Sequence, residues 1–189
     1  MSKEKAKSAD VVSGALVAKT CSGEAVVALG RFDFECIGVD GKVRWKDSAP
    51  NLVVNQGLQY MAGTSLDGAT VRITSWFIGL WGAAALNTPA ATDTLASHSG
   101  WAENTSYGGN RKACTFAAAT TAMPSVVTNS ASVAQFSMNA TTTIGGAFLC
   151  SVNSGTSGTL FSGSSFTSSD RAVISGDTIN VTYTLSLSA

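Results

Sequence analysis

Apolar and polar side chains alternate strictly in two neighbouring stretches of the chain. Residues 32–36 read Phe-Asp-Phe-Glu-Cys, residues 43–46 read Val-Arg-Trp-Lys, and Asp40-Gly41 lies between them. A period of two indicates strands with one buried face, and Asp-Gly supplies the positive φ that tight hairpins need. The pattern therefore predicts an antiparallel hairpin. It places Asp33 and Glu35 on the solvent face, where they are not a convergent pair of catalytic acids.

The C-terminal stretch alternates in the same way. One face of residues 178–188 carries apolar side chains, and the other carries hydroxyls and amides. The turn residues Ser175-Gly176-Asp177 come directly before it. We therefore expect a long, half-buried strand. Its apolar face consists of Ile179, Val181, Tyr183, Leu185 and Leu187.

The residues between these stretches predict one short helix and further strands. Leu52–Met61 has apolar residues at helical spacing, and Gly63 is expected to end the helix. Ala83–Asn110 has no sustained period and predicts a long loop with at most one helical turn, and loops of this length are often functional. Gly145-Gly146 lacks the spacing of a nucleotide motif and predicts a bulge or close packing inside a strand. The predicted strands are Val71–Leu80, Arg111–Phe116, Ala131–Met138, Thr143–Cys150, Thr159–Phe161 and Ala172–Ile174.

Together these segments predict a mainly β fold. Short strands at regular spacing favour an antiparallel β-sandwich, jelly-roll-like, with one short helix and a long loop. We assign this domain to residues 25–189. Residues 1–24 are charged at first and then small and mixed, and they predict an extended N-terminal arm, either poorly ordered or in contact with a partner.

The charge content is low and unevenly distributed. The 189 residues include 12 basic and 12 acidic side chains, and only nine of these lie beyond Pro50. A typical domain surface is roughly 25–35% charged. Zero net charge gives no footprint for nucleic acid, and no run of about 20 apolar residues predicts a membrane span. Interface cores are depleted of charge, so this composition suits a protein that packs against others.

Residues that could carry chemistry are few, and we expect no enzyme, no cofactor and no metal site. His98 is the single histidine, and Asp93 and Ser97 come from the same short stretch without a nucleophile elbow. Most aspartates stand beside Gly, Ser or Thr, where Asp stabilises turns. The four cysteines lack CxxC pairs, which argues against a zinc site. They are Cys21, Cys36, Cys114 and Cys150, and we expect the second and fourth to be core side chains.

Candidate partner contacts lie in the long loop and near the N-terminus. Trp101 and Tyr107 are the aromatic residues most suited to an exposed contact, whereas the other tryptophans lie in strand contexts. Lys3, Lys5 and Lys7 are basic candidates, although a solvated terminus is the simpler interpretation. The first apolar stretch, residues 11–18, is broken by Ser13 and Gly14 and lacks the cleavage context of a signal peptide. We therefore expect synthesis in the cytoplasm with reduced thiols.

The order of several motifs resembles a family of tailed-bacteriophage structural proteins. The resemblance runs across most of the chain, and the order and spacing of the pieces carry it. These pieces are Gly30–Cys36, Asp40–Trp45, Asn51–Gly57, Trp76–Leu80, Gly100-Trp101, Arg111–Ala113, Ile144–Phe148 and Ser175–Tyr183.

This resemblance implies a decoration or cement protein that binds the outside of the icosahedral capsid. A β-sandwich over the seams between capsomers would add contacts that resist internal DNA pressure. The implied partners are the major capsid protein and further copies of the chain, as a homodimer or homotrimer, without nucleic acid or membrane. The implied location is the capsid exterior of the virion, assembled in the host cytoplasm. A tail, fibre or receptor-binding module, with a sugar bound through Trp101 and Tyr107, remains the alternative.

Overall fold

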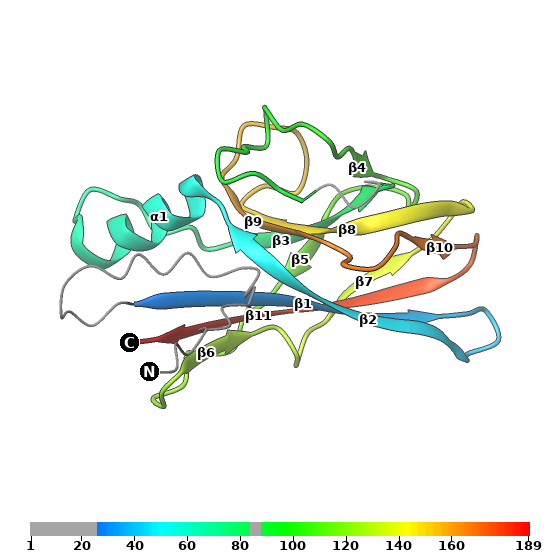
Figure 1. The fold of residues 1–189 in the computed structure, drawn as a ribbon, viewed down its shortest axis with the longest axis horizontal. Helices are drawn as coiled ribbons and strands as arrows, with labels where there is room; N and C mark the ends of the chain where they lie inside the picture. The colour runs from blue at the N-terminus through cyan, green and yellow to red at the C-terminus, as the bar shows by residue number, and fades with distance from the viewer. Residues whose placement is uncertain (1–25, 84–87) are drawn as a thin grey trace, which may run out of the picture.

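The computed structural model describes residues 26–83 and 88–189 of the chain. In these residues the chain forms one short helix and a series of antiparallel strands (Figure 1). The mainly β prediction is confirmed. The elements are β1 Val27–Ile37, β2 Val43–Val53, α1 Asn55–Leu66, β3 Trp76–Gly82, β4 Glu103–Asn104, β5 Lys112–Cys114, β6 Ser125–Thr128, β7 Ala134–Ser137, β8 Thr142–Cys150, β9 Leu160–Ser165, β10 Arg171–Val173 and β11 Thr178–Ser188.

The two stretches with the clearest alternation lie side by side. β1 pairs with β2 through the predicted hairpin, in which Gly41 has a φ of 75°. β1 also pairs along its whole length with β11, from Val27 opposite Ser188 to Ile37 opposite Thr178. Both predicted strands are confirmed, and each turns its apolar face to the same side.

Strand β2 joins the two limbs of the sheet. Its first part pairs with β1, and its last residues pair with β9, with Leu52 opposite Gly163. The β1 limb comprises β1, β11, β6 and β7, and the β8 limb comprises β9, β8, β3, β4, β5 and β10 (Figure 1). Because hydrogen bonds connect β4 to β6 without a break, this is a single open antiparallel sheet. The predicted two-sheet sandwich, or jelly roll, is not confirmed.

The core lies where the two limbs face each other. Phe32 and Tyr183 come from the β1 limb, with ring centroids 4.8 Å apart, and both are buried. Ile78 and Leu149 join the same cluster from the β8 limb. Full burial of such a side chain contributes about 1.5–3 kcal/mol. The alternating pattern therefore holds the limbs together as well as defining the strands.

The glycine pair in β8 packs closely against its neighbours, as predicted. The pairing of β3 and β8 shifts at this point, since Trp81 lies opposite Gly146 whereas Gly82 lies opposite Ile144. Gly145 is thus the extra residue of a bulge. A Cβ on Gly146 would collide with the indole of Trp81 and the carbonyl of Ser164.

Helix α1 and strand β6 differ from the sequence-based expectations. Gly63 does not end the helix, which runs on to Leu66 and closes with the Asp67 N–H donating to the Gly63 carbonyl, 2.8 Å away. At this position a Cβ would meet the side chain of Thr70, so the glycine allows the following loop to pack against the helix. Strand β6 was not predicted at all.

Candidate interaction surface

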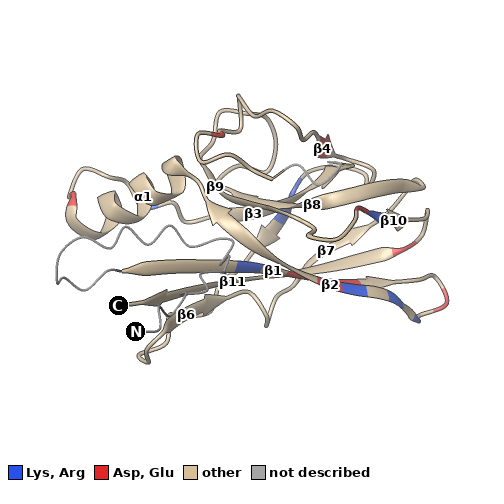
Figure 2. Ribbon diagram, viewed as in Figure 1, with Lys and Arg blue, Asp and Glu red and all other residues tan. Residues whose placement is uncertain are grey.

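The two ends of the molecule differ in charge (Figure 2). One end, which we call the hairpin end, consists of the β1–β2 turn with the adjoining parts of both strands, β10, the turn before β11 and the start of β11. It carries most of the charged residues in the described chain. The opposite end, the α1 end, consists of α1, the loop 67–75, the segment 117–124, β6 and the paired ends of β1 and β11. Of the described charged residues, it carries Asp67 and Arg72.

Charges at the hairpin end are largely neutralised by each other. The Nε of Arg44 donates to the buried carboxylate of Asp177 at 2.8 Å, and the Nζ of Lys46 lies 2.7 Å from Glu35. The Lys46 hydrogen bond lowers the pKa of Glu35. Because these groups already have partners, the hairpin end offers few charges to another molecule.

The α1 end exposes apolar side chains. Leu66 is 92% exposed at the end of the helix, and Val71 is 83% exposed in the next loop. Isolated apolar side chains are common on surfaces, but a group of them at an end with little charge is typical of a contact region. The other exposed apolar residues of the α1 end are Val26, Val27, Leu29, Leu58 and Met123.

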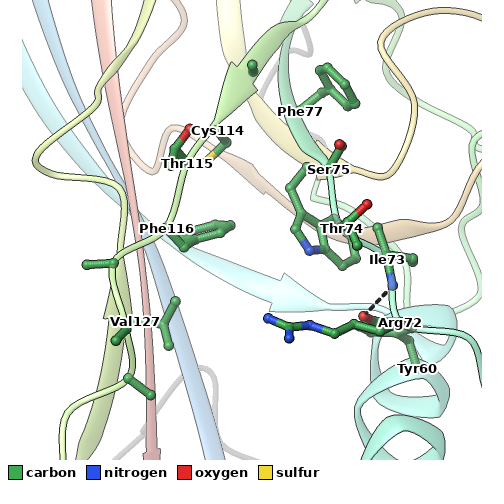
Figure 3. A pocket seen from close by; sticks show the side chains of 15 residues that line it. Tyr60, Arg72, Ile73, Thr74, Ser75, Phe77, Cys114, Thr115, Phe116 and Val127 are labelled. Carbon is green, nitrogen blue, oxygen red and sulfur yellow. Dashed lines mark hydrogen bonds between the residues drawn. The ribbon is translucent and has the colours of Figure 1, made fainter.

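A groove opens at the α1 end between the two limbs. Its larger part has a volume of about 750 Å³ and lies between Tyr60 of α1, Trp76 of β3 and Phe116 after β5 (Figure 3). The Tyr60 hydroxyl accepts a hydrogen bond from the Ile73 N–H at 2.9 Å, which fixes the loop that forms one wall. The groove therefore has a defined shape on this side.

A second, more apolar part adjoins the first. It has a volume of about 260 Å³ and shares Tyr60, Trp76 and Phe116 with the larger part. Leu185 and Leu187, from the end of β11, close it on the side of the β1 limb. Their side chains continue the apolar face of β11 beyond the filled core, so that face is only partly covered at the α1 end.

Arg72 is the charged residue of this groove. Its side chain points from the loop after α1 into the space facing Phe116 and Val127 (Figure 3). It makes no ion pair with any residue in 26–83 or 88–189. Asp67, the acid nearest in sequence, instead accepts hydrogen bonds from the Ala69 N–H and the Thr70 hydroxyl, which lower its pKa.

The buried Asp177 stabilises the turn before β11, as expected from its neighbours in sequence. Asp177 accepts from the Ile174 N–H at 3.0 Å as well as from Arg44, and its carboxylate faces the thiol of Cys36. Burial, and after it the charge of Asp177, raises the pKa of Cys36 to about 11. A thiol protonated at neutral pH is a poor nucleophile. We therefore assign Cys36, Arg44 and Asp177 a structural role.

A partly buried ion pair anchors the long loop. Arg111 donates to both carboxylate oxygens of Glu103 at 2.8 Å and to the carbonyls of Val152 and Gly155. Its guanidinium also lies 5.1 Å from the ring centroid of Phe148. A bidentate geometry with satisfied donors is typical of a structural pair.

The structure overturns the expectation that Trp101 is exposed. The indole is 7% exposed, packs against Trp81 with centroids 4.6 Å apart, and donates its Nε1–H to Asp93 at 3.2 Å. His98 stacks on the same indole, and its Nδ1 lies 3.0 Å from the Trp101 carbonyl and not beside Asp93. His98, Asp93 and Ser97 are therefore not arranged as a catalytic triad. The loop buries its own aromatic residue because Asp93 supplies an acceptor for the indole N–H.

Tyr107 is also buried, contrary to expectation. It is 4% exposed and packs edge-on against Phe136 at 4.8 Å. Its hydroxyl has no hydrogen-bond partner within the described chain, and burial, followed by the charge of Glu103, raises its pKa. Apart from β4, residues 88–110 are irregular and contain no helical turn.

The basic candidates Lys3, Lys5 and Lys7, the predicted arm and Cys21 lie outside the described residues. Cys36 and Cys150 are buried core side chains, as predicted, and so is Cys114. In the described part of the chain, no group of three metal-ligating residues comes together. Among the same residues, no helix has the length and apolar character needed to cross a membrane.

The groove is the feature that sequence reasoning missed. Its walls come from α1, β3, the segment after β5, β6 and the end of β11, which lie far apart in the sequence. The one available signal was the apolar face of β11, which extends to Leu187. In comparisons with known proteins, no family model, no curated protein and no solved structure matches this chain.

Proposed function

We propose that this chain is a non-catalytic virion component: a decoration or cement protein on the outer capsid surface of a tailed bacteriophage. The motif order described above supports this proposal. The structural observation that carries it is the contrast in charge between the ends of the molecule: ion-paired charges gather at the hairpin end, whereas the α1 end combines exposed apolar side chains with few charges (Figure 2).

The mechanism is passive attachment. The α1 end is the surface that faces the shell, and Leu66 and Val71 are its most exposed apolar side chains. Exposed apolar anchors in a region with few charges are suited to a desolvated contact. Many symmetry-related copies each add binding free energy to the assembled shell, which stabilises it without any reaction.

The partners in this proposal are the major capsid protein and further copies of the chain, as a homodimer or homotrimer that matches capsid symmetry. The chain would then be located on the capsid exterior. Burial of Trp101 and Tyr107 supports this proposal over a sugar-binding tail module, for which these two residues were the expected exposed aromatic contacts.

Co-sedimentation with purified shells that lack the protein tests the contact surface. We expect the unaltered chain to sediment with the shells, and the double variant Leu66→Asp, Val71→Asp to bind at least about tenfold more weakly. Val39→Asp is the matched control, because Val39 is 72% exposed at the hairpin end. If both variants bind like the unaltered chain, the α1 end is not the contact.

A further inference from the structure

The first residue that the structure describes lies beside the groove. Val26 lines a small hollow together with Met123 and Leu187. Leu187 also lines the apolar part of the groove between the limbs. The 25 residues that precede Val26 are therefore attached to the domain next to the opening of an apolar groove.

One part of those 25 residues has the composition that such a groove accepts. Residues 11–18 read Val-Val-Ser-Gly-Ala-Leu-Val-Ala, with no charge and mostly short apolar side chains. Lysines, glutamate and aspartate dominate residues 3–10 instead. If the apolar run covered Leu185, Leu187 and Trp76, apolar surface of the run and of the groove would be removed from water.

The length of the connection fits. Seven residues, 19–25, lie between Ala18 and Val26, and the eight steps from one to the other span at most about 29 Å at about 3.3–3.6 Å for each extended residue. The apolar run is itself eight residues long and can cover a similar distance. A segment that enters beside Leu187 therefore has enough chain to follow the groove toward the loop that carries Arg72.

The charges fit the same direction. Arg72 points into the far part of the groove without an acidic partner among the described residues (Figure 3). Asp10 directly precedes Val11, at the far end of a segment that enters near Leu187. A carboxylate at this point would pair with the guanidinium in a partly desolvated setting.

We propose that residues 11–18 bind in the groove of their own chain, running from Leu187 toward Arg72, with Asp10 paired to Arg72. This segment completes the apolar face of β11 and the core at the α1 end. The inference concerns the free chain and does not depend on the capsid proposal, so either can fail without the other.

Hydrogen exchange on the full-length chain tests the proposal, with residues 1–9 as the internal reference. We expect amides of 11–18 to exchange at least about tenfold more slowly than those of 1–9. Leu16→Asp should abolish this difference, while slow exchange in β11 shows that the domain remains folded. Equal exchange rates for the two segments in the unaltered chain would overturn the proposal.

Charge reversal tests the direction. Arg72→Asp should reduce the protection of residues 11–18, and adding Asp10→Arg should restore it, because the pair is re-formed with opposite signs. A structural role of Arg72 alone would give no such rescue. Protection that is unaffected by Arg72→Asp, or that is not restored by the second change, contradicts the pairing.

Paired cysteines distinguish the same chain from a second copy. In a Cys21→Ser background, Ala15→Cys with Thr64→Cys, which lines the groove, should form a disulfide within one chain on mild oxidation. Ala15→Cys with Asp40→Cys, at the hairpin end, should remain reduced. Disulfide-linked dimers from the first pair would show that the segment binds a second copy and would overturn the proposal.

Discussion

Trp81 occupies the space beside Gly146 that a side chain on Gly146 would need. The indole is fully buried, and the bulge at Gly145 brings the two residues opposite each other in neighbouring strands. The close packing of β3 and β8 therefore requires both the large side chain of Trp81 and the absence of a side chain at Gly146.

Gly146→Ala should destabilise the domain by about 2 kcal/mol, because the new methyl group has to displace Trp81 or the backbone of β9. Urea denaturation of both proteins measures the difference. Gly68→Ala is the control, since nothing lies within 4 Å of the added Cβ, and it should be neutral or stabilise by about 0.5 kcal/mol. Equal effects at the two positions would contradict the packing described.

Removing the carboxylate of Glu103 should be costly. Glu103→Ala leaves the Arg111 guanidinium, whose side chain is 4% exposed, without its compensating charge, and we expect a loss of about 3 kcal/mol. Lys46→Ala breaks the exposed pair with Glu35 and should leave the denaturation midpoint nearly unchanged. If Glu103→Ala shifts the denaturation midpoint as little as Lys46→Ala does, the Glu103–Arg111 pair does not anchor the loop.

Stability should fall in alkaline solution. Burial raises the pKa of Cys114 and of Tyr183 to about 12, and Cys36 is raised to about 11. The unfolded chain releases these protons at lower pH, thiols near about 8.5, so the folded state binds more protons between the two values. Unfolding is then favoured as pH rises, by up to about 1.4 kcal/mol per group and pH unit.

Calorimetry from about pH 8 to about pH 10 measures this dependence as a falling Tm. Cys114→Ala removes one of the groups and should make the fall shallower. A Tm that is constant or rises over this range would contradict the buried, protonated state of the thiols.

Trp101→Ala should behave as a core substitution and cost about 3–5 kcal/mol, because the indole packs on Trp81 and Phe148 and bonds Asp93. Leu58→Ala, at an exposed position of α1, should cost much less. Thermal unfolding separates the two. If Trp101→Ala is as mild as Leu58→Ala, the ring is an exposed contact after all.

The strands with a clear period could be predicted from the sequence, and the reason is visible in the structure. β1 and β11 each bury one face along most of their length, so burial imposes alternation on their residues. β6 carries four half-buried residues and has no such constraint, and it was therefore missed. The helix was predicted, but neither of its ends was. Leu52 and Val53 belong to β2, so α1 begins at Asn55, and Gly63 serves the packing of Thr70 and not the termination of α1.

Burial in the loop and the groove depends on residues distant in sequence. Trp101 looked exposed because its surroundings are Ser, Gly and Ala, whereas Asp93 and Trp81 enclose it in space. The groove has no local pattern at all, since Tyr60, Phe116 and Leu187 meet only after the limbs fold together. The sheet path likewise depends on β2 pairing with two partners, which alternation along β2 does not reveal.

Electron microscopy of virions labelled with an antibody against this chain tests the central claim most directly. The capsid proposal predicts label over the whole icosahedral shell in a regular array, accessible without disrupting the particle. Label confined to the tail or its fibres, or no label on intact virions, would contradict it.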